Sequence, residues 1–208
     1  MQTNNKDFLI VVDVQPAYQD ACQDIIYDII DKINNTEQPI IFFYVGKEMD
    51  CDRKSDVIGY LLENGIEENR IDGIRFIEKD YGFIRTWMDA GVSHETIVKT
   101  IQYMKKNQIN DTRDFDDIDW KNTVGNQYAK PVYTEELFVM PNFNQKIFEL
   151  STVDNFELIG GGRYECLLEI DLYLQGLGKK TSITEQLCYN RDDNKARLHK
   201  KNKQKNKY

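Results

Sequence analysis

The sequence predicts an α/β domain with a doubly wound, mainly parallel β-sheet in a three-layer α/β/α, Rossmann-like arrangement. Three segments, 7–14, 38–46 and 155–162, are apolar runs rich in strand-forming residues, which is typical of strands buried on both faces of a parallel sheet. Segments with the apolar spacing of amphipathic helices alternate with them. In folds of this kind ligands bind at the carboxyl ends of the strands.

The N-terminal part of the chain reads as one βαβ unit. The run 7–14 (DFLIVVDV) predicts the first strand, and Pro39 introduces the second strand at 38–46. Between them, 21–34 carries five isoleucines at helical spacing, which form one apolar stripe. A strand, helix and strand within about 40 residues should be joined by a right-handed crossover.

The remaining predicted elements continue the alternation. Ser93 is a good N-cap for a helix, and Gly178 a plausible C-terminal stop for another. In order, they are a helix at 54–70, a short apolar stretch at 73–85, a helix at 93–109, a polar irregular segment at 110–130, a short strand at 136–141, a helical turn at 143–150, the third strand at 155–162, a helix at 165–178 and a last strand at 182–189.

Length and charge indicate one domain with a basic tail. The 208 residues suffice for a single domain, which we assign to 1–190. Residues 191–208 carry eight Lys and Arg against two Asp, so a net charge of −8 leaves the body at −14. An acidic body disfavours nucleic-acid binding. We interpret the tail as flexible and solvated, and contact with RNA, DNA or an acidic partner stays open.

The sequence also indicates the compartment. No apolar run approaches the roughly 18 residues that a membrane helix needs, and the first residues lack the features of a signal peptide. We therefore expect a cytoplasmic protein without membrane contact. In that setting the four scattered cysteines should be free thiols.

Two strand ends carry residues with chemical potential. Asp13, followed by Gln15, ends the first strand, and the turn Gly160–Gly162 leads to Cys166 at the start of a helix. A cysteine in a first helical turn has its thiolate stabilised by the helix dipole and by free backbone N–H groups. The same N–H groups can form an oxyanion hole. A nearby Asp could act as general base.

These two motifs together resemble the isochorismatase-like cysteine hydrolases. FLIVVDVQPAY is similar to the opening strand of that family, and FELIGGGRYECLLEIDLYLQGLG is similar to its second signature, in which a glycine precedes the nucleophilic cysteine by six residues. Gly160 and Cys166 keep that spacing. The resemblance covers about 60 residues at the two ends of the chain, and residues 79–128 match nothing in the family pattern, which suggests a subfamily-specific insertion.

The resemblance implies a mechanism and a set of site residues. Cys166 would attack a small amide, carbamoyl or related substrate, Asp13 would act as base and then acid, and a lysine would assist both. Lys130, 36 residues before Cys166, is the first choice for that lysine and Lys79, after the apolar RFI, the second; a site without a lysine is the third possibility. Substrate or oxyanion binding falls to Gln15, Gly161, Gly162 and Glu165.

The resemblance also bears on cofactors and assembly. It implies a non-proline cis peptide at Gly161–Gly162 and a homo-oligomer, by default a dimer. The zinc ligands of the nicotinamidase branch have no counterpart, since the only histidines are His94 and His199 outside such a motif, so we expect no metal or other cofactor.

Other interpretations stay open. Cys166 could be a small buried core residue, and Asp13 could cap a helix that begins near Pro16. The protein could be a catalytically inactive relative that serves in binding or interaction. A metal-dependent phosphoesterase that uses Asp13 with the carboxylates of 114–119 is a third interpretation; those carboxylates lack the pattern of a calcium loop, and a solvated acidic loop explains them.

Overall fold

Five parallel strands form the centre of the protein. In this computed structural model the described residues are 7–46, 51–79, 84, 87–88, 91–109, 116–123, 125 and 154–190. The strands are β1 (Phe8–Val12), β2 (Ile40–Val45), β3 (Ile74–Lys79), β4 (Asn155–Gly160) and β5 (Lys180–Cys188). They lie in the order β3-β2-β1-β4-β5, and every pair is parallel. The predicted α/β class with a parallel sheet is confirmed.

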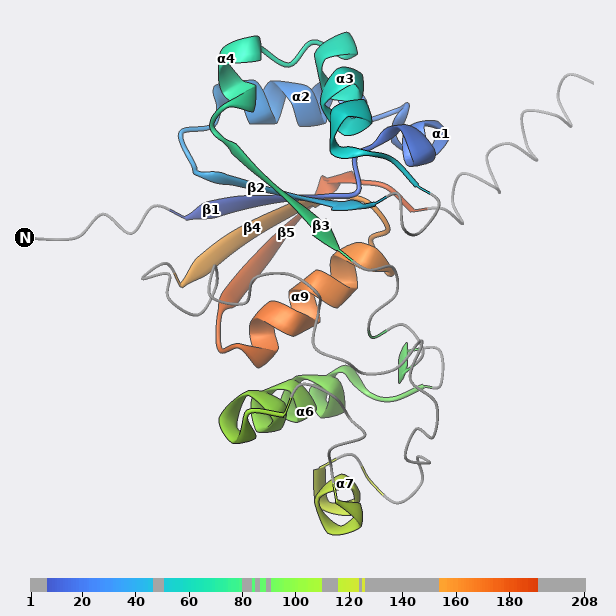
Figure 1. The fold of residues 1–208 in the computed structure, drawn as a ribbon, viewed down its shortest axis with the longest axis vertical. Coiled ribbons are helices and arrows are strands. Elements are labelled where there is room, and N and C mark those ends of the chain that lie inside the picture. The colour runs from blue at the N-terminus through green and yellow to red at the C-terminus, as the bar shows by residue number, and fades with distance from the viewer. Residues whose placement is uncertain are drawn as a thin grey trace, which may run out of the picture.

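Helices cover both faces of this sheet (Figure 1). The 3-10 helix η1 (Pro16–Tyr18) and helices α1 (Gln19–Cys22), α2 (Ile26–Asn35), α3 (Lys54–Glu63) and α4 (Glu68–Ile71) belong to one side. On the other side α9 (Cys166–Gly176) lies against the sheet, with α6 (His94–Asn107) beneath it and α7 (Asp117–Thr123) farther out. Each face therefore has its own buried apolar core.

The strand order reverses at β1. From β1 the chain moves to β2 and β3 on one side, and β4 and β5 extend the sheet on the other. Val12, the last residue of β1, pairs with Phe43 of β2 and with Gly160 of β4. The carboxyl ends of β1 and β4 therefore meet at a topological switch point, the place where open α/β sheets bind ligands.

Several predicted elements differ in detail from those observed. The helix expected over 21–34 begins only at Ile26, after η1 and the short α1. The helix expected over 54–70 is divided into α3 and α4, because Gly65 has a φ of +96° and the chain reverses there. The irregular segment 110–130 contains α7. The strand at 136–141 and the turn at 143–150 lie outside the described residues.

The segment that matched no family pattern contributes to the core. Ile97, Ile101 and Met104 of α6 are buried against α9. At the closest approach a Cβ on Gly176 would meet Ile101 Cγ2 at 2.4 Å, so this residue must lack a side chain. Ser93 caps α6 as predicted, since its hydroxyl accepts a hydrogen bond from Thr96 N at 3.2 Å. Helix α6 is thus part of the domain.

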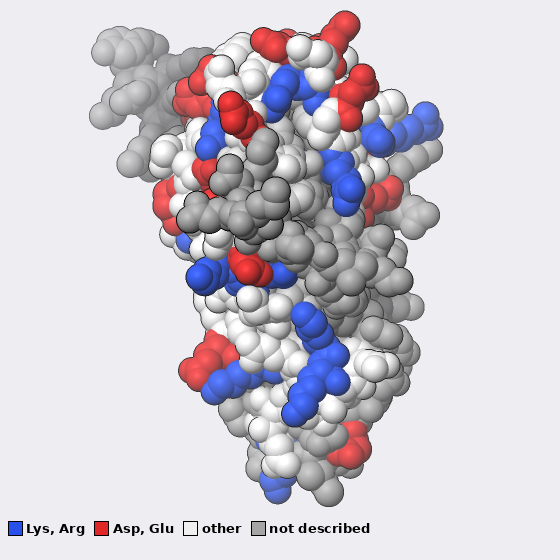
Figure 2. All heavy atoms as spheres, turned by 90° about the vertical axis from the view of Figure 1, so that its left-hand side faces the viewer, with Lys and Arg blue, Asp and Glu red and all other residues white. Residues whose placement is uncertain are grey.

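The molecular surface carries both signs of charge. On the face in Figure 2, acidic and basic side chains of described residues are intermixed in the upper half, and in the lower half Lys and Arg side chains stand on largely uncharged surface with a few acidic side chains among them. In the part of the chain that the structure describes, every helix is too short or too polar to cross a membrane.

Candidate functional site

Asp13 occupies a strained position directly after β1. Its φ of +52° lies in the left-handed region, which Asp tolerates better than most residues. The backbone is held there by Asp13 N–H, which donates to Phe43 O at 2.9 Å, and by Asp13 O, which accepts from the Tyr189 hydroxyl at 2.8 Å. The carboxylate is buried and caps no helix, because η1 begins without a side-chain cap. The capping interpretation of Asp13 is therefore wrong.

The glycine turn after β4 is built by close backbone approach. Gly160 has a φ of +102°, and a Cβ there would meet Val12 O at 2.3 Å. A Cβ on Gly161 would meet the Tyr189 hydroxyl oxygen at 1.9 Å. Gly162 has a φ of +56°. These positive φ angles reverse the chain through trans bonds, so the cis peptide expected at Gly161–Gly162 is not found.

Cys166 is the first residue of α9, as the sequence predicted. The helix follows the glycine turn directly, and Gly162 O accepts from the N–H groups of Glu165 and Leu167 at 2.7 and 3.2 Å. Cys166 itself is only 7% exposed and packs within the core shared with α6. Its side chain thus lies at the positive end of a helix and is nearly covered.

A lysine from the far edge of the sheet meets Asp13. Lys79 Nζ lies 3.1 Å from Asp13 Oδ2, and both side chains are fully buried. Lys79 is the last residue of β3, in register with Val45 of β2, so its side chain reaches past the end of β2 to the end of β1. Among the described residues the Asp13 and Lys79 side chains form this ion pair, and neither makes a hydrogen bond of good geometry.

The structure changes which lysine is the better candidate for assisting Asp13. Lys130, the first choice from the sequence, lies outside the described residues. Lys79, the second choice, is the lysine that contacts Asp13. The sequence placed Lys130 first because its separation of 36 residues from Cys166 suits the family pattern, while Lys79 only follows the short apolar run RFI.

Burial keeps the thiol of Cys166 neutral. Desolvation is the largest cause that raises its pKa well above 9.0; the positive charge of Lys79 lowers it, and the negative charges of Asp13 and Glu169 raise it. The carboxylate of Asp13 interacts with the thiol, although among the described residues neither of its oxygens accepts a well-formed hydrogen bond. The expectation of a resting thiolate at the helix N-terminus is thus wrong, because desolvation outweighs the single ammonium.

The same neighbours change the pKa of Lys79, but burial acts on it in the opposite direction. Burial by itself lowers its pKa, but the Coulomb attraction of neighbouring acidic groups, first of all Asp13, outweighs burial and raises the pKa above 10.5. Lys79 is therefore positively charged at neutral pH. The resting site holds a charged lysine, a carboxylate and a protonated thiol.

Two tyrosines and a second cysteine surround this group. Burial, followed by the charge of Asp13, raises the pKa of Tyr18 and brings that of Cys22 to about 12. Burial also raises the pKa of Tyr189 well above 10.0, with Cys22 and Asp13 as further causes. The Tyr18 hydroxyl lies 4.0 Å from Cys51 Sγ. These groups stay protonated at neutral pH, and of the three the Tyr189 hydroxyl donates to the backbone carbonyl of Asp13.

Gln15 serves the scaffold. Its Oε1 accepts from Val45 N at 2.9 Å, and its Nε2 donates to Val45 O at 3.0 Å and to Asp52 Oδ2 at 2.8 Å. Asp52 Oδ2 also accepts from Ala17 N at 2.9 Å. The buried amide therefore joins the ends of β1 and β2, and it positions the site instead of facing a ligand.

The backbone N–H groups proposed for an oxyanion hole divide into two sets. Gly161 N–H donates to Val12 O at 2.7 Å and Glu165 N–H to Gly162 O at 2.7 Å, so both are occupied. The N–H groups of Gly162 and Cys166 have no backbone acceptor among the described residues. These two are therefore the better candidates for oxyanion donors.

The side chains of the turn hold it to β5. Arg163 makes a bidentate ion pair with Glu185, with Nη2 to Oε1 at 2.8 Å and Nε to both oxygens at 2.9 Å. Arg163 N–H also donates to Tyr189 O at 3.0 Å. The half-buried Glu165 forms the N-cap position of α9, without a side-chain capping bond. Arg163 thus anchors one side of the turn to β5, and Glu165 lies on the other side of the turn.

Glu169 is a site residue that the sequence analysis missed. It lies three residues after Cys166 on the same side of α9, it is 1% exposed, and its Oε1 accepts from Ile84 N at 3.2 Å. Its charge acts on both Lys79 and Cys166. The signal available in the sequence was a Glu inside an otherwise apolar helix, ECLLEIDLYL, where a buried carboxylate needs a partner.

The structure offers little support for a metal site. Among the described residues no group of three or more His, Cys, Asp or Glu side chains is arranged to hold a metal ion. In the acidic segment 114–119, Asp116 is exposed, Asp114 lies outside the described residues, and the side chains of Asp117 and Asp119 are likewise not described. The phosphoesterase interpretation therefore gains nothing from the described geometry.

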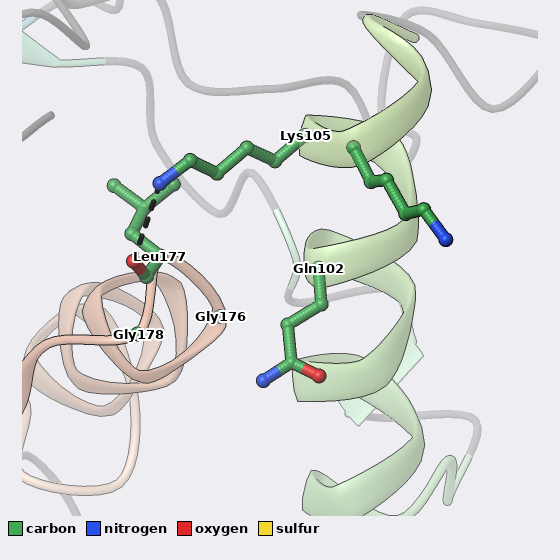
Figure 3. Close-up of a pocket in the computed structure, with 6 residues that line it drawn as sticks. Gln102, Lys105, Gly176, Leu177 and Gly178 are labelled. Atoms are coloured by element: carbon green, nitrogen blue, oxygen red, sulfur yellow. Dashed lines mark hydrogen bonds between the residues drawn. The ribbon is translucent and has the colours of Figure 1, made fainter.

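A surface groove lies at the opposite end of α9. It has a volume of about 380 Å³ and is lined by Gln102, Lys105 and Lys106 of α6 together with Gly176–Gly178 (Figure 3). Lys105 Nζ donates to Leu177 O at 3.3 Å across it. Eleven helical residues, or roughly 15 Å, separate this groove from Cys166. The groove does not belong to the candidate site.

Comparison with known proteins gives no further guide. No family model matches the chain, and neither a curated protein nor a solved structure is significantly similar to it. The class of protein that fold and site define is thus an α/β protein with a parallel five-stranded sheet and a buried Asp-Lys-Cys cluster at its switch point.

Proposed function

We propose that this protein is a cysteine hydrolase of the isochorismatase-like type, acting on a small amide, carbamoyl or related substrate through a covalent intermediate on Cys166. The observation that carries the proposal is the convergence of Asp13, Lys79 and Cys166 from the ends of β1, β3 and the turn after β4. Three chemically complementary side chains from distant parts of the sequence are buried together at one sheet edge, where such folds bind ligands.

Burial of these groups favours a functional explanation. An ion pair without access to water usually contributes little net stability, and apolar residues of similar size are often as stable. The left-handed backbone of Asp13 adds a further cost of order 1–3 kcal/mol. Strain and buried charge at one place are typical of active sites.

The neutral thiol determines the order of proton transfers. Cys166 Sγ bonds to the substrate carbonyl carbon as its proton passes to the Asp13 carboxylate, so a free thiolate is not needed beforehand. The N–H groups of Gly162 and Cys166 stabilise the oxyanion. Asp13 then gives the proton to the departing nitrogen. In the second half Asp13 takes a proton from water, which attacks the thioester, and the proton returns to sulfur as the acid leaves.

Lys79 supports both halves of this sequence. Its fixed positive charge, 3.1 Å from Asp13, compensates the carboxylate while it is negative and attracts the negative charge that develops at sulfur. No cofactor takes part in these steps.

The proposal predicts acylation of Cys166 by an activated ester. p-Nitrophenyl acetate should give a burst of nitrophenolate and an acetyl adduct on Cys166, found by mass spectrometry of peptides from the whole protein. Cys166→Ala should remove the burst, while the matched Cys188→Ala should keep it. Primary amides and N-carbamoyl amines should then release ammonia or amine with the wild type. A burst that persists in Cys166→Ala, or adducts spread over all four cysteines, would refute the assignment.

One observation favours a second function. The 7% exposure of Cys166 and its raised pKa also fit a non-catalytic relative that binds a ligand at the same sheet edge. Such a protein would bind the amide panel in calorimetry without acylation or turnover. Acylation of Cys166 by p-nitrophenyl acetate separates the two functions.

A further inference from the structure

Tyr189, the first residue after β5, makes hydrogen bonds to three segments at the candidate site. Its hydroxyl donates to Asp13 O at 2.8 Å. Its N–H donates to Gly160 O at 3.1 Å, and its carbonyl accepts from Arg163 N at 3.0 Å. The residue is buried. One tyrosine therefore connects the end of β1 to the turn that leads to Cys166.

The backbone at Asp13 interrupts the alternation of β1. Successive side chains of a strand point to opposite faces, and Leu9 and Val11 belong to the core on the α2 side. Alternation alone would therefore direct Asp13 to that face. Lys79 follows Ile77 by two residues, and Ile77 packs against the core on the α9 side. The left-handed φ of +52° breaks the alternation, and Asp13 Oδ2 reaches Lys79 Nζ at 3.1 Å.

This left-handed backbone needs support from its surroundings. A residue other than glycine keeps such a conformation only where neighbouring groups hold it. The main chain of Asp13 has two such contacts: its N–H donates to Phe43 O at 2.9 Å, and its carbonyl accepts from the Tyr189 hydroxyl. The first bond continues the ladder between β1 and β2 and is available to any residue with a backbone N–H. The second bond requires a particular side chain.

The tyrosine hydroxyl is confined to its position. Gly161 lies so close that a Cβ there would meet the hydroxyl oxygen at 1.9 Å. Gly161 N–H donates to Val12 O at 2.7 Å, directly before Asp13. The hydroxyl thus lies between the glycine turn and the carbonyl of Asp13, and it sets the separation of these two segments.

We propose that Tyr189 is a positioning residue of the candidate site: its hydroxyl holds the left-handed backbone that directs the Asp13 carboxylate to Lys79, and it fixes Asp13 relative to the turn before Cys166. The effect on catalysis rests on the proposed function, while the effect on the Asp13 backbone does not. The two bonded residues are 176 positions apart in the chain, so no local sequence pattern marks this role.

Two tyrosine variants isolate the hydroxyl. Tyr189→Phe removes it and keeps the ring. Tyr44→Phe is the matched control, because Tyr44 is also buried in the core on the α2 side. Its hydroxyl donates to Glu78 Oε2 at 3.4 Å instead of to Asp13. Both variants lose one hydroxyl hydrogen bond from the same core.

Hydrogen exchange of two backbone amides in the whole protein tests the effect on Asp13. The reference amide is that of Leu9, which donates to Pro39 O at 3.0 Å at the other end of β1. Tyr189→Phe should raise the ratio of the Asp13 rate to the Leu9 rate about fivefold, because the loss of one hydrogen bond favours local opening. Tyr44→Phe should leave the ratio unchanged. Equal acceleration of both amides in Tyr189→Phe, or no acceleration, would overturn the proposal.

Burst kinetics with p-nitrophenyl acetate test the effect on catalysis. Tyr189→Phe should lower the acylation rate constant at saturating ester about 10- to 100-fold, because the base is misplaced. The ester concentration for half-maximal rate should stay near that of the wild type, since the hydroxyl binds no substrate. Tyr44→Phe should acylate like the wild type, and an equally fast Tyr189→Phe would overturn the proposal. A wild type without a burst would refute the hydrolase, and the exchange ratio would then decide this inference by itself.

Discussion

At the scale of single residues, the Asp13–Lys79 pair dominates the site. Two charged side chains with 1% and 0% exposure have lost nearly all contact with water, and they compensate each other across 3.1 Å. The net stability from such a pair is small, yet removal of one partner leaves a buried charge without compensation. Removing either side chain alone should therefore cost much more stability than removing both together.

This asymmetry gives a prediction for stability. Lys79→Met preserves the length of the side chain and should lower the free energy of unfolding by about 3–5 kcal/mol, because Asp13 is left as a buried anion. The double variant Asp13→Asn with Lys79→Met should recover most of that loss. Urea denaturation measures both.

A half-buried pair provides the control for this comparison. Lys32→Met breaks the 2.8 Å ion pair with Glu157, where both side chains keep contact with solvent, and should cost about 0–1 kcal/mol. If Lys79→Met cost no more than Lys32→Met, the buried pair would not have the role given to it here.

The reactivity of Cys166 also belongs to this scale. A thiol whose pKa is raised by burial is a poor nucleophile until a base removes its proton. Cys51 is more exposed than Cys166 and should react first with iodoacetamide in the native protein. Selectivity for Cys166 is expected only from reagents that occupy the site, which is why the activated ester is the better probe.

At the scale of elements, the turn between β4 and α9 depends on the absence of side chains. Gly161 is in direct contact with the Tyr189 hydroxyl, which donates to Asp13 O at 2.8 Å. A side chain at Gly161 would push the tyrosine away from Asp13. The turn and the strained carboxylate are therefore parts of one packing arrangement.

A pair of glycine variants tests this dependence. Gly161→Ala should destabilise the protein by about 1–3 kcal/mol, because the new methyl group overlaps the tyrosine. Gly59→Ala, in the middle of α3 with nothing within 4 Å, should stabilise it by about 0.5–1 kcal/mol through helix propensity. Thermal unfolding compares the two, and a neutral Gly161→Ala would contradict the packing described.

The predicted elements succeeded where a local signal is strong. Strands β1, β2 and β4 were recognisable because strands buried on both faces are continuously apolar. The N-cap at Ser93 and the start of α9 at Cys166 were also predicted correctly. The end of β3 at Lys79 was missed, because its mixed burial gives no clear period.

At the scale of the whole molecule, the buried titratable groups predict how stability depends on pH. Burial is the first cause that raises the pKa of Cys22 to about 12, of Cys188 to about 11 and of Tyr60 to about 12, and the pKa of Cys166 is raised as well. A folded-state pKa above the unfolded value means that the folded protein keeps a proton that the unfolded chain releases.

The sign of the effect follows directly. The stabilisation from these groups is fully present below the ordinary thiol value of 9.0 and is lost as the pH rises toward their folded-state values. Each group contributes a slope of up to about 1.4 kcal/mol per pH unit. Urea unfolding at increasing alkaline pH should show this decline, and Cys22→Ala should reduce its slope. A stability that is flat above 9.0 would contradict the burial of these groups.

The sequence alone determined the class of fold and two of the three central site residues as candidates. Apolar strands alternating with amphipathic helices require a layered α/β packing, and the residues that end β1 and begin α9 are marked by adjacent strand, glycine and helix signals. Those signals are local, so they can be read along the chain.

Only the tertiary structure decided which lysine contacts Asp13, that Glu169 is the fourth ionisable group, and that the thiol of Cys166 is protonated. Each of these depends on contacts between residues far apart in the chain and on how completely water is excluded from them. Desolvation and Coulomb interactions depend on three-dimensional distance, and no spacing of residues along the sequence specifies that distance.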